Sequence, residues 1–154
     1  MRFTSRDTKT TCVPAEAIAK GIIVVDASAL LELLLGTTTG AAIDRVVRSA
    51  AVAVGPAHID AEVLSALGRL ERARQISAEV VGDCLDDLAV MPMTRVPLPG
   101  LLAGAWALRA NIAVRDALYV VVAQRTGAKL ITVDRRLHSA LDHLFPDLGY
   151  PMLD

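Results

Sequence analysis

The chain has 154 residues, a length that suits one domain with a single hydrophobic core. Its 17 acidic and 16 basic residues leave a net charge of −1, and aromatic residues make up 3%, so neither overall charge nor stacking side chains point to nucleic acid. No apolar run reaches the roughly 18 residues of a membrane span, and residues 1–20 hold no apolar segment typical of a secretory signal. Two cysteines are too few for a disulfide framework, so we expect a cytoplasmic protein without a membrane partner.

Short apolar runs alternate with helical patterns along the chain, as in a doubly wound α/β domain. Residues 1–21 are polar and predict a mobile N-terminal extension ahead of one compact domain over residues 22–154. Pro92 places the third strand at a sheet edge, and Gly127 is expected to end a helix. The predicted strands are 22–25, 52–54, 90–96, 130–133 and, at the end of the chain, 150–153. The predicted helices are 28–35, 41–50, 59–74, 77–88, 100–110, 116–125 and 135–144.

Acidic residues recur where this pattern would form a binding edge. Asp26 and Asp134 each directly follow a predicted strand. Because ligands bind at the carboxyl ends of parallel strands, both carboxylates are expected at that edge of the sheet. Asp116 opens an apolar helix, and Glu62 lies at the margin of the apolar face of the helix 59–74, from which it can point toward the same edge.

Each of these acids has a simpler explanation when it is taken alone. An aspartate after a strand commonly forms a turn or cap, an acid in a first helical turn stabilises the helix dipole, and Glu62 could be a solvated charge. Together, four acids from four separate elements would repel one another, and no nearby lysine could neutralise them all. A hard divalent cation such as Mg²⁺ or Mn²⁺ prefers oxygen ligands of this kind. The sequence therefore favours a cation at this edge.

Four segments resemble the PIN-domain ribonucleases, specifically the VapC toxins of bacterial toxin–antitoxin pairs. They are 24–30 (VVDASAL), 60–67 (DAEVLSAL), 114–120 (VRDALYV) and 130–137 (LITVDRRL). They follow the family's order and spacing from about Ile22 to the end of the chain, and the last two, joined by AQRTGAK at 123–129, form the most specific signature. The extension before Ile22 departs from the pattern, because family members usually begin at the first strand.

The resemblance implies a PIN-like three-layer α/β/α fold with a central parallel sheet of about five strands. It implies a metal-dependent endoribonuclease toxin that cleaves single-stranded or loop regions of RNA, of the tRNA or ribosomal RNA class, and is neutralised by a VapB-like antitoxin. Ser28 and Thr132 would be small hydroxyl residues beside the acids. One or two metal ions suit the acids equally well. The residues implied to bind Mg²⁺ or Mn²⁺ are Asp26, Glu62, Asp116 and Asp134.

Two further expectations concern the surface. Arg115, Arg135 and Arg136 flank the acids and could hold phosphates, although solubility explains surface arginines equally well. Hydrophobic residues make up 53% of the chain, so we expect an apolar surface that a partner covers, as in a homodimer that also binds the antitoxin.

Other enzymes with related sheets lack a required residue in this chain. A haloacid-dehalogenase-type phosphatase needs a second aspartate two residues after the first, where this chain has Ser28. A response-regulator receiver needs a lysine after its fifth strand, whereas Lys129 precedes a strand. The alternative that stays open is a catalytically inactive PIN-fold module that binds RNA or protein, and metal-dependent RNA cleavage would separate the two.

Overall fold

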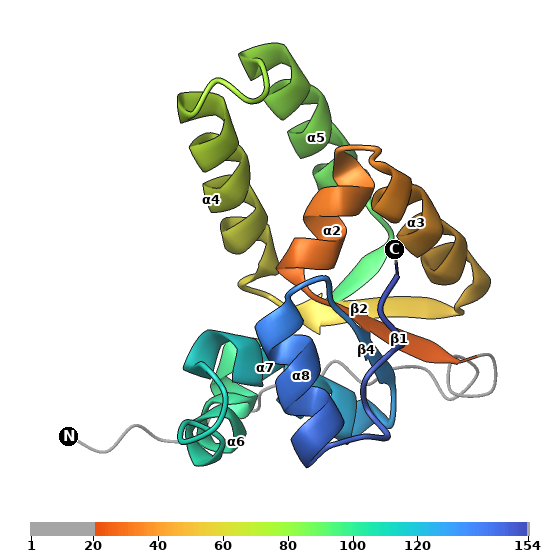
Figure 1. Ribbon diagram of the computed structural model, residues 1–154, viewed down its shortest axis with the longest axis vertical. Coiled ribbons are helices and arrows are strands. Elements are labelled where there is room, and N and C mark those ends of the chain that lie inside the picture. Colours follow the sequence, from red (N-terminus) through yellow and green to blue (C-terminus); the bar gives the residue numbers. More distant parts are fainter. Residues whose placement is uncertain (1–20, 154) are drawn as a thin grey trace.

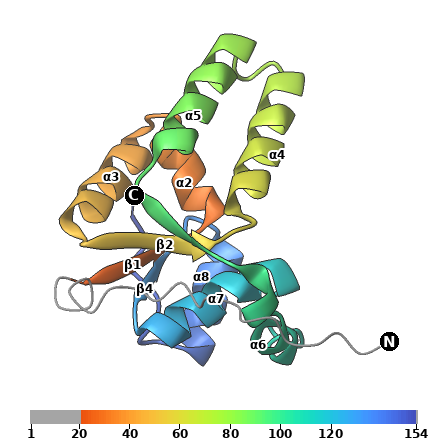
Figure 2. The same ribbon diagram turned by 180° about the vertical axis from the view of Figure 1, so that it is seen from behind.

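The computed structural model describes residues 21–153, and the predicted mobile extension therefore lies outside the described residues except for Gly21. The strands are β1 (Ile22–Val25), β2 (Val52–Pro56), β3 (Met93–Val96) and β4 (Lys129–Ile131). The helices are α2 (Ala27–Leu34), α3 (Thr38–Ser49), α4 (Ile59–Arg72), α5 (Ala78–Val90), the 3-10 helix η1 (Leu98–Gly100), α6 (Leu102–Ala107), α7 (Val114–Thr126) and α8 (Arg135–Leu144). Helices α2 to α5 lie on one side of the sheet, from which α4 and α5 project as a pair, and α6, α7 and α8 lie on the other side (Figure 1, and from behind in Figure 2). This is the expected three-layer α/β/α arrangement.

The sheet within residues 21–153 has four parallel strands in the order β3-β2-β1-β4. In the interior strand β1, Val24 pairs with Val54 of β2 and with Leu130 of β4. These three side chains are fully buried, because helices cover both faces of the sheet. Since all four strands run the same way, the segments that follow their carboxyl ends lie along one edge of the sheet.

Helix α7 packs against β1, β2 and β4 and is buried on all sides over its central two turns. Every residue from Ala117 to Ala123 is buried, which accounts for a sequence that is apolar all round rather than on one stripe. Gly127 ends the helix with a left-handed backbone (φ 63°), as expected for a residue without a Cβ. Asp116, in the exposed first turn of α7, is therefore held in place by the buried part of the helix that follows it.

Three predicted strands have wrong boundaries, and one of them, 130–133, is β4 over Lys129–Ile131. The third strand begins at Met93 rather than residue 90, because α5 continues to Val90, but β3 does lie at the sheet edge as predicted. The second strand continues through Pro56 and pairs there with Val96. The Ala57 N–H donates to the Val96 carbonyl oxygen at 2.8 Å. Because successive residues of a strand point their N–H groups to opposite sides, the nitrogen of Pro56, which carries no hydrogen, faces β1. The pairing of β2 with β1 has already ended before this residue.

The predicted strand at 150–153 does not form. Instead Leu130 makes an isolated parallel bridge with Gly149, in which its N–H donates to Leu148 and its carbonyl accepts from Tyr150. The predicted helix 100–110 is shortened to α6, because Gly100 ends the 3-10 helix η1 and Leu101 is the N-cap of α6. Among the residues that the structure describes, no helix combines the length and the apolar character needed to cross a membrane.

An ion pair that the sequence analysis did not anticipate ties α4 to β3. The Arg95 guanidinium donates to both carboxylate oxygens of Asp60 at 3.1–3.3 Å and to the carbonyl oxygens of Leu88, Met91 and Met93. It therefore provides hydrogen-bond donors for free carbonyl groups at the C-terminal end of α5, and through Asp60 it also holds the start of α4. Asp60 therefore has a structural contact, although its side chain is 45% exposed.

Candidate active site

The four acids singled out in the sequence line one pocket of about 240 Å³. Asp26 follows β1, Glu62 and Asp116 lie in the first turns of α4 and α7, and Asp134 is the N-cap of α8. The structure thus brings all four to the edge formed by the carboxyl ends of the strands. They remain spread over the walls of the pocket, and within residues 21–153 no three His, Cys, Asp or Glu side chains lie close enough together to form a ready-made metal cluster.

Asp26 is held rigidly at the base of the pocket. It is 5% exposed, and its Oδ1 accepts from the Ser28 hydroxyl and the Ala29 N–H, both at 2.8 Å. Its Oδ2 accepts from the Thr132 hydroxyl at 2.7 Å. Burial raises the pKa of Asp26 from 3.8 to about 6, despite these hydrogen bonds, and the charge of Asp116 adds to the rise. The carboxylate is therefore oriented but electrostatically costly to ionise.

Ser28 and Thr132 each join two chain segments around Asp26. The Ser28 hydroxyl oxygen accepts from the Val133 N–H at 3.1 Å, and the Thr132 hydroxyl oxygen accepts from the Asp134 N–H at 3.0 Å. Residues that follow β1 and β4 are thereby fastened to each other at the sheet edge. This explains why small hydroxyl residues stand beside the first and last acids.

Glu62 is surrounded by positive and hydrogen-bonding groups. Tyr119 donates its hydroxyl to Oε2 at 2.7 Å, and His58 Nε2 lies 3.2 Å from the same oxygen, although neither ring nitrogen of His58 makes a well-aligned hydrogen bond. Arg115 Nε lies 3.6 Å from Oε1. Burial acts to raise the pKa of Glu62, but the close approach of His58, the Tyr119 hydrogen bond and the charge of Arg115 together lower it below its usual value.

Asp116 and Asp134 form the more open side of the pocket. Burial raises the pKa of Asp116, and the charges of Asp134 and Glu62 raise it further. Asp134 Oδ1 accepts from the N–H groups of Arg136 and Leu137 at the start of α8, which leaves Oδ2 outside the cap. The helix-capping explanation therefore holds for Asp134, and it accounts for only one of its two oxygens.

This set of side chains suits a hard cation. The donors are carboxylate oxygens, which Mg²⁺ and Mn²⁺ prefer, and the charge that raises the pKa of Asp116 is what a bound cation would neutralise. Several residues that line the pocket were missed in the sequence, among them Tyr119 and Arg69. Tyr119 lies three residues after Asp116 and so shares its helix face, a spacing that could have singled it out.

The predicted phosphate-holding arginines are divided by the structure. Arg115 lines the acid pocket, whereas Arg135 and Arg136 line a separate shallow hollow on α8 with His143. All three side chains are exposed. Arg69, about two helical turns beyond Glu62 on α4, lines the acid pocket instead.

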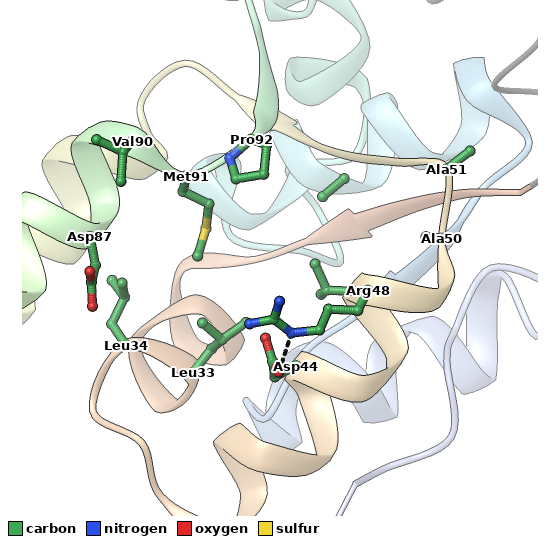
Figure 3. Close-up of a pocket in the computed structure, with 12 residues that line it drawn as sticks. Leu33, Leu34, Asp44, Arg48, Ala50, Ala51, Asp87, Val90, Met91 and Pro92 are labelled. Carbon is green, nitrogen blue, oxygen red and sulfur yellow. Dashed lines mark hydrogen bonds and ion pairs between the residues drawn. The ribbon is translucent and has the colours of Figure 1, made fainter.

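A second, larger hollow of about 480 Å³ lies away from the acids, and we refer to it as the apolar cavity. Figure 3 shows Leu33 and Leu34 of α2 and Met91, just after α5, facing into it. The Asp44–Arg48 ion pair, 2.6 Å long, lies on its α3 wall. The full lining is Leu33, Leu34, Asp44, Val47, Arg48, Ala50, Ala51, Ala53, Asp87, Val90, Met91 and Pro92.

Comparison with known proteins agrees with the fold and with the segments singled out in the sequence. The PIN domain family profile matches residues 23–142. The chain is 44% identical over 118 residues to Ribonuclease VapC3 of Mycobacterium tuberculosis, covering 77% of this chain and 86% of that one. It is 38% identical over 123 residues to Ribonuclease VapC12 of the same species, covering 79% of this chain and 94% of that one.

A solved structure gives the same result for the fold. The crystal structure of PAE2754 from Pyrobaculum aerophilum superposes with a TM-score of 0.59 at 21% identity, covering 86% of this chain and 88% of that one. The profile match, the identity to the two mycobacterial proteins and the parallel sheet with acids at its carboxyl edge lead to one assignment. The chain belongs to the PIN domain family.

Proposed function

We propose that the chain is a metal-dependent endoribonuclease of the VapC type. The observation that carries the proposal is the acid pocket, in which four carboxylates from four elements face one space and the charges of two of them raise the pKa of Asp116. The relatives with the printed name of ribonuclease support this reaction class. The proposed ligands of Mg²⁺ or Mn²⁺ are Asp26, Glu62, Asp116 and Asp134.

The chain's own residues would divide the work in the pocket. Asp26 is tied by three donors and so fixes the base of the site, while Asp116 presents a carboxylate toward its open side. When bound, the cation would lower the pKa of a water molecule and neutralise charge on the phosphoryl group. Arg115 and Arg69 at the pocket wall would bind phosphate oxygens of an RNA strand, because a guanidinium pairs with phosphate through two parallel hydrogen bonds.

The proposed substrate is a single-stranded or loop region of RNA, of the tRNA or ribosomal RNA class. A catalytically inactive binding module is not favoured, because all four acids are retained and line one pocket. The test is cleavage of an end-labelled RNA by the purified chain with Mg²⁺ or Mn²⁺, with EDTA, and by an Asp116→Asn variant. We expect site-specific cleavage that both EDTA and the substitution abolish; RNA binding without turnover would contradict the proposal.

We further propose that a VapB-like antitoxin covers the apolar cavity with an apolar segment. The cavity is lined mainly by methyl-bearing side chains, and Val90 at its rim is 79% exposed. Its acid Asp44 is already paired with Arg48, whereas Asp87 forms no ion pair within the described residues. A segment with an apolar stripe and one basic residue beside Asp87 is therefore complementary.

We also propose a homodimer, for which the described surface offers apolar side chains on the opposite layer of the fold. Leu102 and Trp106 of α6 and Val114 of α7 are 55%, 61% and 43% exposed, on two helices that pack together. Trp106 lies under the Arg109 guanidinium at 4.6 Å, which leaves much of its ring open to a second copy. Light scattering on the purified chain tests this: we expect a dimer that Trp106→Ser weakens, and a monomeric wild-type chain would contradict it.

A further inference from the structure

The Glu62 carboxylate is held from two sides by residues that the resemblance did not assign. His58 and Glu62 lie one turn apart on α4, and Tyr119 reaches the same oxygen, Oε2, from α7. The His58 and Tyr119 rings also pack against each other, with their centroids 5.1 Å apart and an interplanar angle of 48°. We infer that Tyr119, supported by His58, is a positioning residue that fixes which oxygen Glu62 presents to the cation; this rests on the proposed function.

The burial of Tyr119 makes its hydroxyl a dependable donor. The residue is 1% exposed, and a tyrosine hydroxyl ordinarily titrates far above neutral pH, so it keeps the proton that it donates to Glu62. Without Glu62 the buried hydroxyl would lose the acceptor 2.7 Å away, and a buried donor without an acceptor costs free energy. Tyr119 and Glu62 are therefore mutually dependent, rather than chance neighbours at a surface.

The two carboxylate oxygens of Glu62 have different neighbours. Oε2 accepts a hydrogen bond from Tyr119 and lies 3.2 Å from His58 Nε2, and both of these side chains are largely buried. Oε1 faces Arg115, whose side chain is 77% exposed and lines the pocket. The oxygen available to a cation is therefore Oε1, with the side chain's other oxygen anchored to the protein interior. Anchoring matters because a glutamate has three rotatable bonds, whose freedom must otherwise be lost when the cation binds.

Helix α7 couples this anchor to a second proposed ligand. Asp116 and Tyr119 lie three residues apart, on the same face of one rigid helix. The helix thus carries one carboxylate itself and orients a second one from α4. In metal sites, partners of this kind typically change affinity or activity by about 10–100-fold when they are removed.

The decisive variant is Tyr119→Phe, which removes one hydroxyl and keeps the ring. The matched control is Tyr150→Phe, because Tyr150 is the chain's other tyrosine and does not line the acid pocket. Mn²⁺ affinity is measured by calorimetry on the full chain without RNA. We expect Tyr119→Phe to weaken Mn²⁺ binding by about tenfold and Tyr150→Phe to leave it unchanged. Equal affinity in the two variants would overturn the inference.

A double-mutant cycle with Glu62→Gln shows whether Tyr119 acts through Glu62. If it does, Tyr119→Phe weakens Mn²⁺ binding in the wild-type background and has little further effect in the Glu62→Gln background. Equal losses in both backgrounds would overturn the inference and leave Tyr119 as a residue of the core. His58→Gln provides a second variant at the same oxygen, with a several-fold loss expected, should Tyr119→Phe not fold to the wild-type circular dichroism spectrum.

Asp116→Asn, measured in parallel, separates this inference from the proposed function. A wild-type chain that binds no Mn²⁺, with an Asp116→Asn variant that cleaves RNA equally well, would reject the proposed function itself. A wild-type chain that binds Mn²⁺, with binding lost in Asp116→Asn but intact in Tyr119→Phe, would reject the positioning role alone.

Discussion

The acid pocket and the apolar cavity lie at opposite edges of one sheet and differ in almost every physical respect. The acid pocket is lined by residues that follow the carboxyl ends of β1 and β4, including Asp26 and Asp134. The apolar cavity is lined by Ala51 and Ala53 around the start of β2 and by Pro92 just before β3. In the acid pocket, side chains are held by short hydrogen bonds. In the apolar cavity, one ion pair is surrounded by methyl groups.

The difference shows what each hollow is suited to bind. A small hard cation gains most from oxygens that are already oriented, and Asp26 has both of its oxygens held. A peptide gains most from apolar area removed from water, at about 25 cal/mol per Å², and it needs no such fixed geometry. Substitutions confined to one hollow should therefore change its own binding and leave the other hollow unaffected.

The largest effect is expected from Asp116→Asn. The substitution removes a proposed ligand, so we expect RNA cleavage to fall by more than about 100-fold. Because the pKa of Asp116 is raised by burial and by neighbouring charge, the metal-free fold should become slightly more stable when this charge is removed. Cleavage assays and thermal unfolding measure the two quantities, and a parallel loss of both would contradict the assignment.

Asp26 should make the stability of the metal-free chain depend on pH. Its pKa is raised from 3.8 to about 6, so the folded chain binds this proton more tightly than the unfolded chain. The stabilisation is complete below pH 3.8 and is lost as the pH rises through about 6. We expect the free energy of unfolding to fall by about 3 kcal/mol over this interval. Denaturant unfolding at both ends measures it, and Asp26→Asn should remove most of the change.

A charge placed at the apolar cavity should affect partner binding alone. Val90→Arg puts a guanidinium at the rim, where the side chain is already 79% exposed, so the fold should tolerate it. We expect the affinity for the cognate antitoxin to fall by about tenfold or more and RNA cleavage to stay unchanged. Val80→Arg is the matched control, since Val80 is 38% exposed on the same helix and does not line the cavity. Equal losses in both variants would place the antitoxin elsewhere.

The smallest effect is expected from Asp44→Asn, which breaks the ion pair on the cavity wall. The Arg48 side chain is 77% exposed, so the pair is screened by solvent. We expect antitoxin affinity to change by less than about fivefold, because apolar area rather than this pair should drive binding. A much larger loss, measured by calorimetry beside Val90→Arg, would show that the cavity recognises charge.

The sequence was most informative where function depends on local order. Asp26 and Asp134 could be placed at the sheet edge because strand, acid and helix follow one another directly in the chain. The prediction from Pro92 that the third strand lies at the sheet edge is confirmed, although Pro92 itself lies just before β3. The alternation of strands and helices was likewise sufficient for the three-layer fold.

Contacts between distant segments could not be predicted in this way. Tyr119 and Glu62 are 57 residues apart, and Asp60 and Arg95 are 35 apart, so neither pair produces a local pattern. Arg135 and Arg136 follow Asp134 directly, yet the turn into α8 directs them to another hollow. Adjacency in sequence predicts a shared element but not the direction in which each side chain points.

The burial of α7 from residue 117 to residue 123 has a consequence for how this protein tolerates substitution. The helix that presents Asp116 has no solvent-facing side chain from residue 117 to residue 123. Substitution of its buried apolar residues should therefore impair the protein as substitution of the acid does. In a saturation mutagenesis screen that selects cells surviving expression of the chain, escape substitutions should accumulate as densely along this helix as at the carboxylates. In the results of such a screen, these helical positions would form one continuous stretch that tolerates few substitutions.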